Sequence, residues 1–208
     1  MYNPTFKINL VRLFNTAFSG SSVSERNQLR GALSSTSFRD QFGKAVIDRI
    51  IQRTSQESKD KDGKPFPKYS DSYMKSDVFK IYGKSSKVNL ELTGEMLSSM
   101  KAIDASQSIV IEMIGDNNKA KAQGHKYGLG KKRVKRDFLG LPQDDLNIIM
   151  ISTISDYQDQ AYAATQELFV GAQQGITFGG QVGNQSGFSA SVSVGDLLRM
   201  INENLNGQ

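Results

Sequence analysis

The sequence contains no cysteine and only one histidine among its 208 residues. Without cysteine, neither a disulfide framework nor a thiolate metal site can form. A zinc site or a histidine-dependent triad would have to depend on His125 alone. The adjacent Lys126 disfavours both a protonated imidazole and a bound metal cation there. We therefore interpret His125 as a hydrogen-bonded structural residue at a helix end.

Long hydrophobic runs are also missing. No stretch approaches the ~18 apolar residues of a membrane-spanning helix, and the first residues lack the apolar region and cleavage site of a signal peptide. We expect neither a membrane partner nor a signal peptide. The hydrophobic content of 38% is modest, which favours a subunit whose neighbours cover part of its surface. The net charge of +5 gives a moderate preference for anionic partners.

Other chemical signatures are incomplete. The glycine-rich runs at residues 128–132 and 179–180 lack the spacing of a phosphate-binding loop. Asp60 and Asp62 lack the glutamate that closes an EF-type calcium loop. We expect no cofactor, no metal and no catalytic residues. A small hydrolase that depends on His125 is the least favoured alternative.

The patterns that are present predict an α+β domain over residues 36–170, with a small antiparallel sheet packed against an N-terminal helix and a long C-terminal helix. Apolar residues recur at three- and four-residue spacing from Phe38 to Ile51, which predicts an amphipathic helix capped by Thr36 or Ser37. Residues 100–103 and 109–114 predict two strands, the second one central in the sheet. Residues 88–92 alternate like an edge strand.

Extended arms are expected on both sides of this domain. Residues 1–35 predict a partly helical N-terminal arm. Residues 171–208 predict a Gly/Gln-rich C-terminal arm that ends in a strand at residues 188–194 and a short helix capped by Asp196.

The stretch around residues 134–145 is the best organised part of the sequence. A short apolar strand at residues 138–141 is followed by Pro142, which suits the first position of a helix. Asp144 and Asp145 then fall in the first helical turn. The helix that follows has a broad apolar surface, which suggests contacts on two sides.

The segment before it, residues 117–136, is the most basic part of the chain and has no carboxylate. We expect a positively charged loop, which is usually just solvated but could line a DNA channel or contact an acidic partner. The residues expected to make such a contact are Lys126, Lys131, Lys132, Arg133, Lys135 and Arg136.

Four segments, taken in order, carry a family resemblance. Residues 62–70 hold an Asp-Gly-x-Pro-aromatic loop that runs into a serine, and residues 92–100 hold a Leu-Thr-x-x-x-x-Ser block. Residues 122–128 read Ala-x-x-His-x-Tyr-Gly, and residues 134–141 contain Arg-Asp-Phe-Leu-Gly-Leu. The chain thereby resembles the bacteriophage virion morphogenesis or tail-completion proteins over about residues 36–155. Phe66 stands where that family usually has tryptophan, and both prolines of its last box are missing.

The resemblance implies a structural neck protein of a tailed bacteriophage, without catalytic residues. Such a protein would form a ring, expected to be a hexamer, at the head–tail junction or tail end, and would complete the tail and join it to the head. Its partners would be copies of itself, adjacent neck, connector or tail-tube proteins, and DNA passing through the ring. It would reside in the virion, and in the host cytoplasm during assembly.

For this function we expect subunit or partner contacts from apolar residues of the 138–141 box, the long helix and the C-terminal arm. They are Phe138, Leu139, Leu141, Ile148, Ile149, Ile151, Phe178, Val192, Leu197 and Leu198. The main alternative is a sequence-independent nucleic-acid-binding protein that uses the basic loop at residues 117–136.

Overall fold

The computed structural model describes residues 4–91, 93–129 and 134–174, with side chains described as far as residue 166. The chain divides into two compact units, Met1–Thr153 and Ile154–Gln208. The first unit carries the sheet and most of the helices. In the described part of the second unit the chain continues as a single helix.

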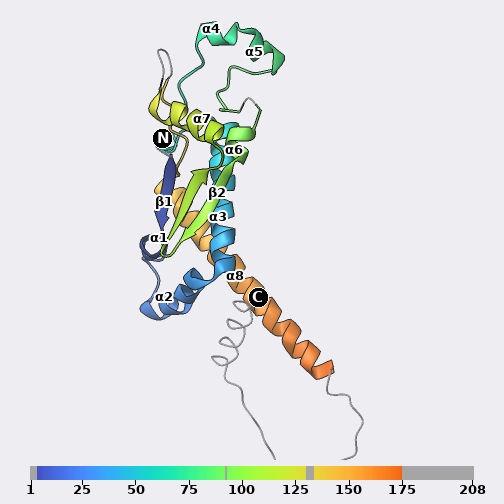
Figure 1. Cartoon of the computed structure of the whole chain (residues 1–208). Helices are drawn as coiled ribbons and strands as arrows, with labels where there is room; N and C mark the ends of the chain where they lie inside the picture. Colours follow the sequence, from blue (N-terminus) through green and yellow to red (C-terminus); the bar gives the residue numbers. More distant parts are fainter. Residues whose placement is uncertain (1–3, 92, 130–133, 175–208) are drawn as a thin grey trace, which may run out of the picture. The chain divides into compact units, whose positions relative to one another are not determined.

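A three-stranded antiparallel sheet forms the centre of the first unit (Figure 1). The strands are β1 (Thr5–Asn9), β2 (Met100–Ala105) and β3 (Ser108–Met113), in the order β1-β3-β2. The predicted hairpin of β2 and β3 and the central place of β3 are confirmed. The register pairs Ile8 with Ile109 and Ala102 with Ile111. Because side chains alternate along a strand, β3 directs its buried residues Ile109, Ile111 and Met113 to one face.

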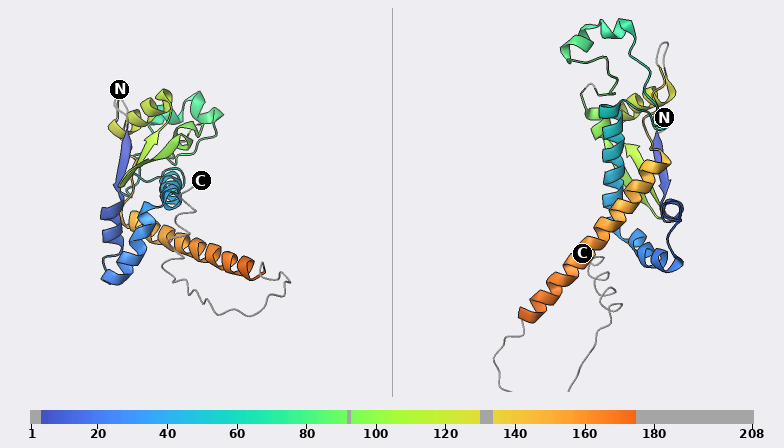
Figure 2. Two further views of the ribbon diagram at one scale, coloured as in Figure 1. Left: turned by 60° about the horizontal axis from the view of Figure 1, so that its bottom comes forward. Right: turned by 180° about the vertical axis from the view of Figure 1, so that it is seen from behind.

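The helix α3 (Thr36–Ile51) covers that face, as Figure 2 shows from behind. Its apolar stripe forms the core, as predicted, with Phe38, Phe42, Val46 and Ile50 fully buried. The N-cap is Ser35, one residue before the predicted positions, and its hydroxyl accepts a hydrogen bond from the amide of Phe38. After residue 51 the helix widens into a π-helical turn, η2 (Gln52–Glu57).

The N-terminal region is an integral part of this unit. We expected residues 1–35 to form an arm, but β1 is a strand of the sheet and pairs with β3 over its whole length. It is followed by α1 (Leu10–Ala17), α2 (Val23–Arg30) and the 3₁₀ turn η1 (Gly31–Ser34). Leu10, Leu13 and Phe14 of α1 are buried. Residues 5–35 therefore share the sheet and core of the domain that we expected to begin at residue 36.

Five more helices complete the described chain. They are α4 (Asp71–Met74), α5 (Asp77–Ile81), α6 (Glu95–Ser98), α7 (Asp116–Tyr127) and α8 (Gln143–Gln174). The predicted basic loop is thus partly wrong, because its first half is the helix α7. Helix α8 begins one residue after Pro142, whose carbonyl accepts a hydrogen bond from the amide of Leu146 at 3.2 Å.

Two predicted strands are absent from the described residues. Residues 88–91 form no strand, although Val88 and Leu90 are buried, because Leu90 adopts a left-handed backbone with φ of 50°. Residues 138–141 are buried but pair with no ladder in the described sheet. At both places the apolar pattern predicts burial correctly. A strand also needs a neighbouring strand as its hydrogen-bond partner.

The close packing of α3 on β2 yields a stability prediction. A Cβ atom at Gly43 would lie 2.5 Å from the Cβ of Ala102. We expect Gly43→Ala to lower the free energy of unfolding by about 1–3 kcal/mol, since overpacking outweighs the better helix propensity of alanine. Gly31→Ala is the matched control, because a Cβ atom at Gly31 would have no neighbouring atom within 4 Å. Urea unfolding of both variants measures the difference, and equal stabilities would contradict the packing argument.

Candidate functional site

The first unit carries a pocket of about 490 Å³. It lies between the loop before α4, α4 itself, residues 84–96, α7 and residues 134–136. All four segments of the family resemblance contribute to its wall. The lining residues are Tyr69, Ser70, Tyr73, Lys84, Leu90, Glu91, Thr93, Gly94, Met96, Lys121, His125, Val134 and Arg136.

Arg136 fixes the loop that forms one wall of the pocket. Its guanidinium donates hydrogen bonds to the carbonyl oxygens of Pro67 (3.1 and 3.0 Å) and Lys68 (3.0 Å). It also lies 5.3 Å from the ring centre of Tyr69, within range of a cation–π contact. Burial lowers the pKa of Arg136 below its usual value. Its amide donates to the carbonyl of His125 at 2.8 Å, which joins this segment to the end of α7.

The other cationic side chains of the pocket also have protein partners. Lys84 donates to the side-chain oxygen of Asn89 at 2.6 Å and to the carbonyl of Glu91. Lys121 forms an ion pair with Glu95 at 3.3 Å. Of the three cations, Lys121 is paired with a carboxylate, whereas the partners of Lys84 and Arg136 are neutral oxygens. Leu90, Met96, Val134 and two tyrosine rings supply apolar wall, which suits a side chain of a protein partner.

Aromatic rings hold α4 and α5 to the pocket. Tyr69 and Tyr73 lie with ring centroids 5.1 Å apart, and Phe79 of α5 contacts both edge-on, at 5.9 and 5.5 Å. Burial raises the pKa of Tyr69, whose hydroxyl accepts a hydrogen bond from the amide of Asn89 at 3.4 Å. These contacts position two short helices that have no buried residue of their own.

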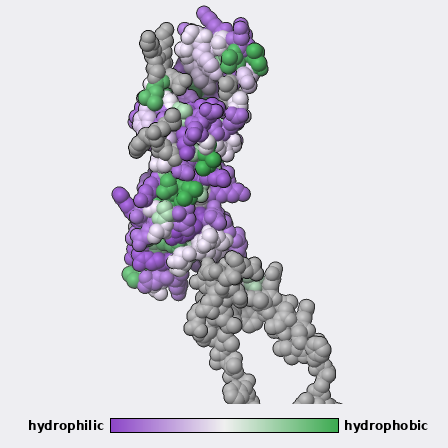
Figure 3. All heavy atoms as spheres, viewed as in Figure 1, coloured by the Kyte–Doolittle hydropathy of each residue, from purple (hydrophilic) through white to green (hydrophobic). Residues whose placement is uncertain are grey.

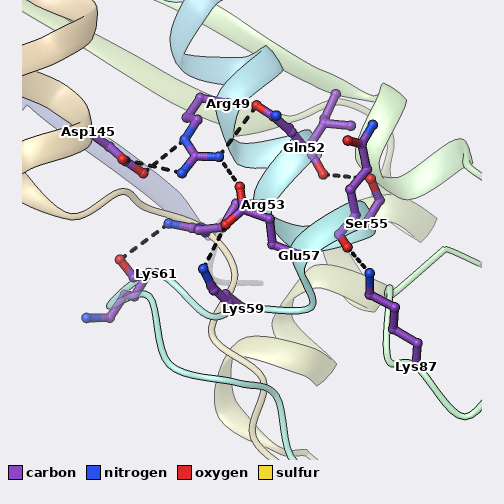
Figure 4. Close-up of polar contacts among 11 residues, drawn as sticks. Arg49, Gln52, Arg53, Ser55, Glu57, Lys59, Lys61, Lys87 and Asp145 are labelled. Atoms are coloured by element: carbon purple, nitrogen blue, oxygen red, sulfur yellow. Dashed lines mark hydrogen bonds and ion pairs between the residues drawn. The ribbon is translucent and has the colours of Figure 1, made fainter.

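A buried arginine joins the loop at Lys61 to the segment that precedes α8. The Arg53 side chain, in η2, is 1% exposed and donates to the carbonyl oxygens of Phe138 (2.8 Å) and Lys61 (3.4 Å). Burial lowers its pKa to about 10. The amide of Lys61 in turn donates to the carbonyl of Asp137 at 2.7 Å. Three distant segments are thus joined around one guanidinium, as Figure 4 shows in part.

A second arginine ties η2 to the start of α8. Arg49 forms ion pairs with Glu57 and, at 3.1 Å, with Asp145 of the first turn of α8 (Figure 4). Hydrogen bonds from Arg49 and Lys59 lower the pKa of Glu57. The predicted first-turn position of Asp145 is confirmed, and the carboxylate also fixes the helix to the domain.

The predicted contact residues separate into three groups. Phe138, Leu139, Leu141 and Ile149 are buried inside the chain, so they are core residues that a neighbouring subunit cannot reach. Ile148 and Ile151 are 65% and 45% exposed and stay available. The remaining four, Phe178, Val192, Leu197 and Leu198, lie outside the described residues, as does nearly all of the predicted C-terminal arm.

The predicted basic contact is divided in a similar way. Lys131, Lys132 and Arg133 lie outside the described residues. Arg136 is engaged by backbone carbonyls in the pocket wall, while Lys135 is exposed. On α7, Lys126 and Lys121 lie on different sides of the helix, since five residues span about one and a half turns. Lys119 and Lys126, seven residues apart, lie on one side of α7, and Lys126 and Lys135 both act on the carboxyl of Asp137.

Several pocket residues were missed by sequence reasoning. Lys84, Glu91 and Tyr73 carried no recognisable signal, because each lies in a short loop or helix without periodicity. His125 lies in the last turn of α7, which confirms its expected place at a helix end. Its position in the pocket wall was not predicted.

Comparisons with known proteins add no relative. The scan against protein-family models finds no match, and neither do the searches of curated proteins and of solved structures. Among the described residues, no helix is both long and apolar enough to cross a membrane. In the same part of the chain, no three His, Asp or Glu side chains are grouped as a metal site would require.

We predict that Arg136→Ala releases the pocket wall. Loss of its hydrogen bonds should lower the free energy of unfolding by about 1–2 kcal/mol and expose the chain after Lys68 to trypsin. The exposed neighbour Lys135→Ala is the matched control and should leave both properties unchanged. Limited trypsin digestion followed by mass spectrometry checks this. Equal cleavage after Lys68 in the two variants would contradict the role of Arg136.

Asp137 gives a prediction about pH. Burial raises the pKa of this carboxyl, with Lys126, Lys61 and Lys135 partly offsetting the effect, and its Oδ1 is buried without a hydrogen-bond partner. The folded protein therefore holds this proton more tightly than the unfolded chain. Stability falls as pH rises from the ordinary pKa of 3.8 through the raised value.

Replacing this carboxyl should consequently stabilise the fold. We expect Asp137→Asn to raise the free energy of unfolding at pH 7, with a difference that shrinks in acid. Asp62→Asn serves as the control with the opposite sign, because the hydrogen bond from Lys61 lowers the pKa of Asp62. Urea unfolding from pH 3 to pH 7 measures both. A loss of stability in Asp137→Asn at pH 7 would refute the burial argument.

Proposed function

We propose that this chain is a structural neck protein of a tailed bacteriophage, which forms a ring at the head–tail junction and completes or terminates the tail. The observation that carries the proposal is the pocket. Four segments that resemble the tail-completion proteins in order, and that are separated by up to about 70 residues, meet around one hollow. The segments that carry the resemblance thus meet at one surface feature of this chain.

The chemistry of the pocket supports a role in protein assembly. Its cations have hydrogen-bond or ion-pair partners within the chain, and aliphatic and aromatic residues form its wall together with polar ones such as Glu91 and Thr93. A hollow of this kind receives an anchoring side chain of a protein partner and excludes water around it. In the proposed function the partner is an adjacent neck, connector or tail-tube protein, and the ring lies in the virion after assembly in the host cytoplasm.

The alternative of sequence-independent nucleic-acid binding is less favoured. Phosphate contacts need several cations on one surface, whereas Lys121 and Arg136 face the pocket and have protein partners. The exposed Lys135 can still face DNA in the ring. A purified protein that retains DNA at low salt and loses it after Lys126→Glu and Lys135→Glu would favour this alternative.

Inactivating the coding sequence in its phage tests the proposal. We expect filled heads and separate tails that fail to join, or tails of irregular length, in electron micrographs. Supplying the wild-type protein from a plasmid should restore joined particles and plaque formation. Normal virions without the protein would overturn the proposal.

Two variants in the same complementation assay test the role of the pocket. Thr93→Trp places a large ring in the pocket wall and should fail to restore joining. Ser86→Trp, an equally large change at an exposed residue outside the pocket, should restore it. Both proteins should be folded and equally abundant. Restoration by both would show that the pocket receives no partner.

A further inference from the structure

Helix α5 presents three large apolar side chains to solvent. Val78, Ile81 and Tyr82 are 44%, 78% and 50% exposed, and their spacing places them on one side of the helix. Phe79, on the other side, packs against Tyr69 and Tyr73 and holds the helix in place. Figure 3 shows hydrophobic residues gathered on α5 within a mostly hydrophilic surface. We call Val78, Ile81 and Tyr82 the α5 face.

Helix α8 presents a second apolar surface in its first turns. Ile148 and Ile151 are exposed and follow Asp144 at helical spacing, so the three lie along one stripe. The opposite side of these turns is buried through Leu146 and Met150. We call Asp144, Ile148 and Ile151 the α8 stripe. It accounts for the broad apolar surface of this helix, because one side is core and the other is left uncovered.

The two surfaces carry opposite charge. Within the first unit, residues 143–153 contain Asp144 and Asp145 and no lysine or arginine, whereas residues 70–87 contain four lysines and two aspartates. Asp145 is paired with Arg49, so Asp144 carries the free charge on the stripe. Opposite charges would therefore surround an apolar contact between the two surfaces and attract each other. Two copies of the α8 stripe would repel each other. Both surfaces belong to the first unit, where Figures 1 and 2 place α5 at one end and the start of α8 behind the sheet.

We propose that the α5 face of one copy docks on the α8 stripe of a second copy. Because the two surfaces differ and lie apart on one unit, the contact is heterologous, and each copy can bind two neighbours. This is the contact that a closed ring requires, and the choice of partner rests on the proposed function. The net positive charge of residues 70–87 favours the α8 stripe, which carries Asp144, over another α5 face.

Single cysteines test this contact directly, because the chain has none of its own. Ile81→Cys and Ile148→Cys change exposed residues, so both variants should fold. Mixed under mild oxidation, they should form a disulfide-linked dimer about tenfold faster than either variant alone, since docking raises the effective concentration of the two thiols. Lys101→Cys, on the exposed edge of β2, is the control partner for each. Added salt should slow the specific pair more than the control pairs.

The double variant Ile81→Cys/Ile148→Cys then shows how many copies are linked to one another. We expect a ladder of linked species on a denaturing gel that ends at the ring size. A mixed pair no faster than the Lys101→Cys controls, faster linkage of either variant with itself, or a double variant linked only within one chain would each overturn the contact.

The same double variant separates this inference from the proposed function. Linkage in purified protein, together with virions that lack the protein, would leave the contact standing and remove the neck assignment. If joined virions contain the protein but show no linkage between positions 81 and 148, the neck assignment would stand and the contact would be refuted.

Discussion

The buried guanidinium of Arg53 is the constraint on which the rest of the first unit depends. A charge removed from water must be surrounded by acceptors, and here they are backbone carbonyls of Lys61 and Phe138. The π-helical turn that carries Arg53, the loop at residues 58–66 and the segment at residues 137–141 must therefore stay together. Within the buried residues 138–141, the carbonyl of Phe138 is thus satisfied by an arginine instead of a strand.

The pocket follows from the same constraint. Once Phe138 is fixed, Arg136 two residues earlier reaches the carbonyls of Pro67 and Lys68, and the loop that carries Tyr69 becomes the pocket wall. Lys84 and Arg136 are hydrogen-bonded within this wall. The hollow that remains is lined by aliphatic, aromatic and polar side chains.

The sequence predicted the parts of this fold that depend on local periodicity. The stripe from Phe38 to Ile50 and the hairpin of β2 and β3 were found because burial repeats along each element. Strand β1 was missed because Ile8 precedes the apolar residues of α1 without a break, and its pairing with residues more than 100 positions later leaves no local signal. The α+β class was nevertheless correct, since it needs only the hairpin and two long helices.

The candidate site was harder to predict for two physical reasons. Apolar spacing cannot distinguish core from interface, so Phe138 and Ile149 were assigned to contacts together with Ile148, although only Ile148 is exposed. A lone arginine after an amphipathic helix also resembles a solvated residue, and nothing near Arg53 in the sequence marks it as buried. The convergence of four segments on one pocket is a tertiary property that the order of motifs suggested but could not locate.

Helix α8 is the element that most needs a neighbour. In the second unit, residues 155–166 are exposed or half-buried, with Tyr162 69% exposed. A helix without cations cannot form the ion pairs at i and i+4 that support solvated helices, and isolated helices gain most of their stability from packing. The uncovered sides of α8 therefore favour a molecule whose helix is completed by a neighbour. In the proposed contact between copies, each subunit would cover the first turns of α8 of its neighbour.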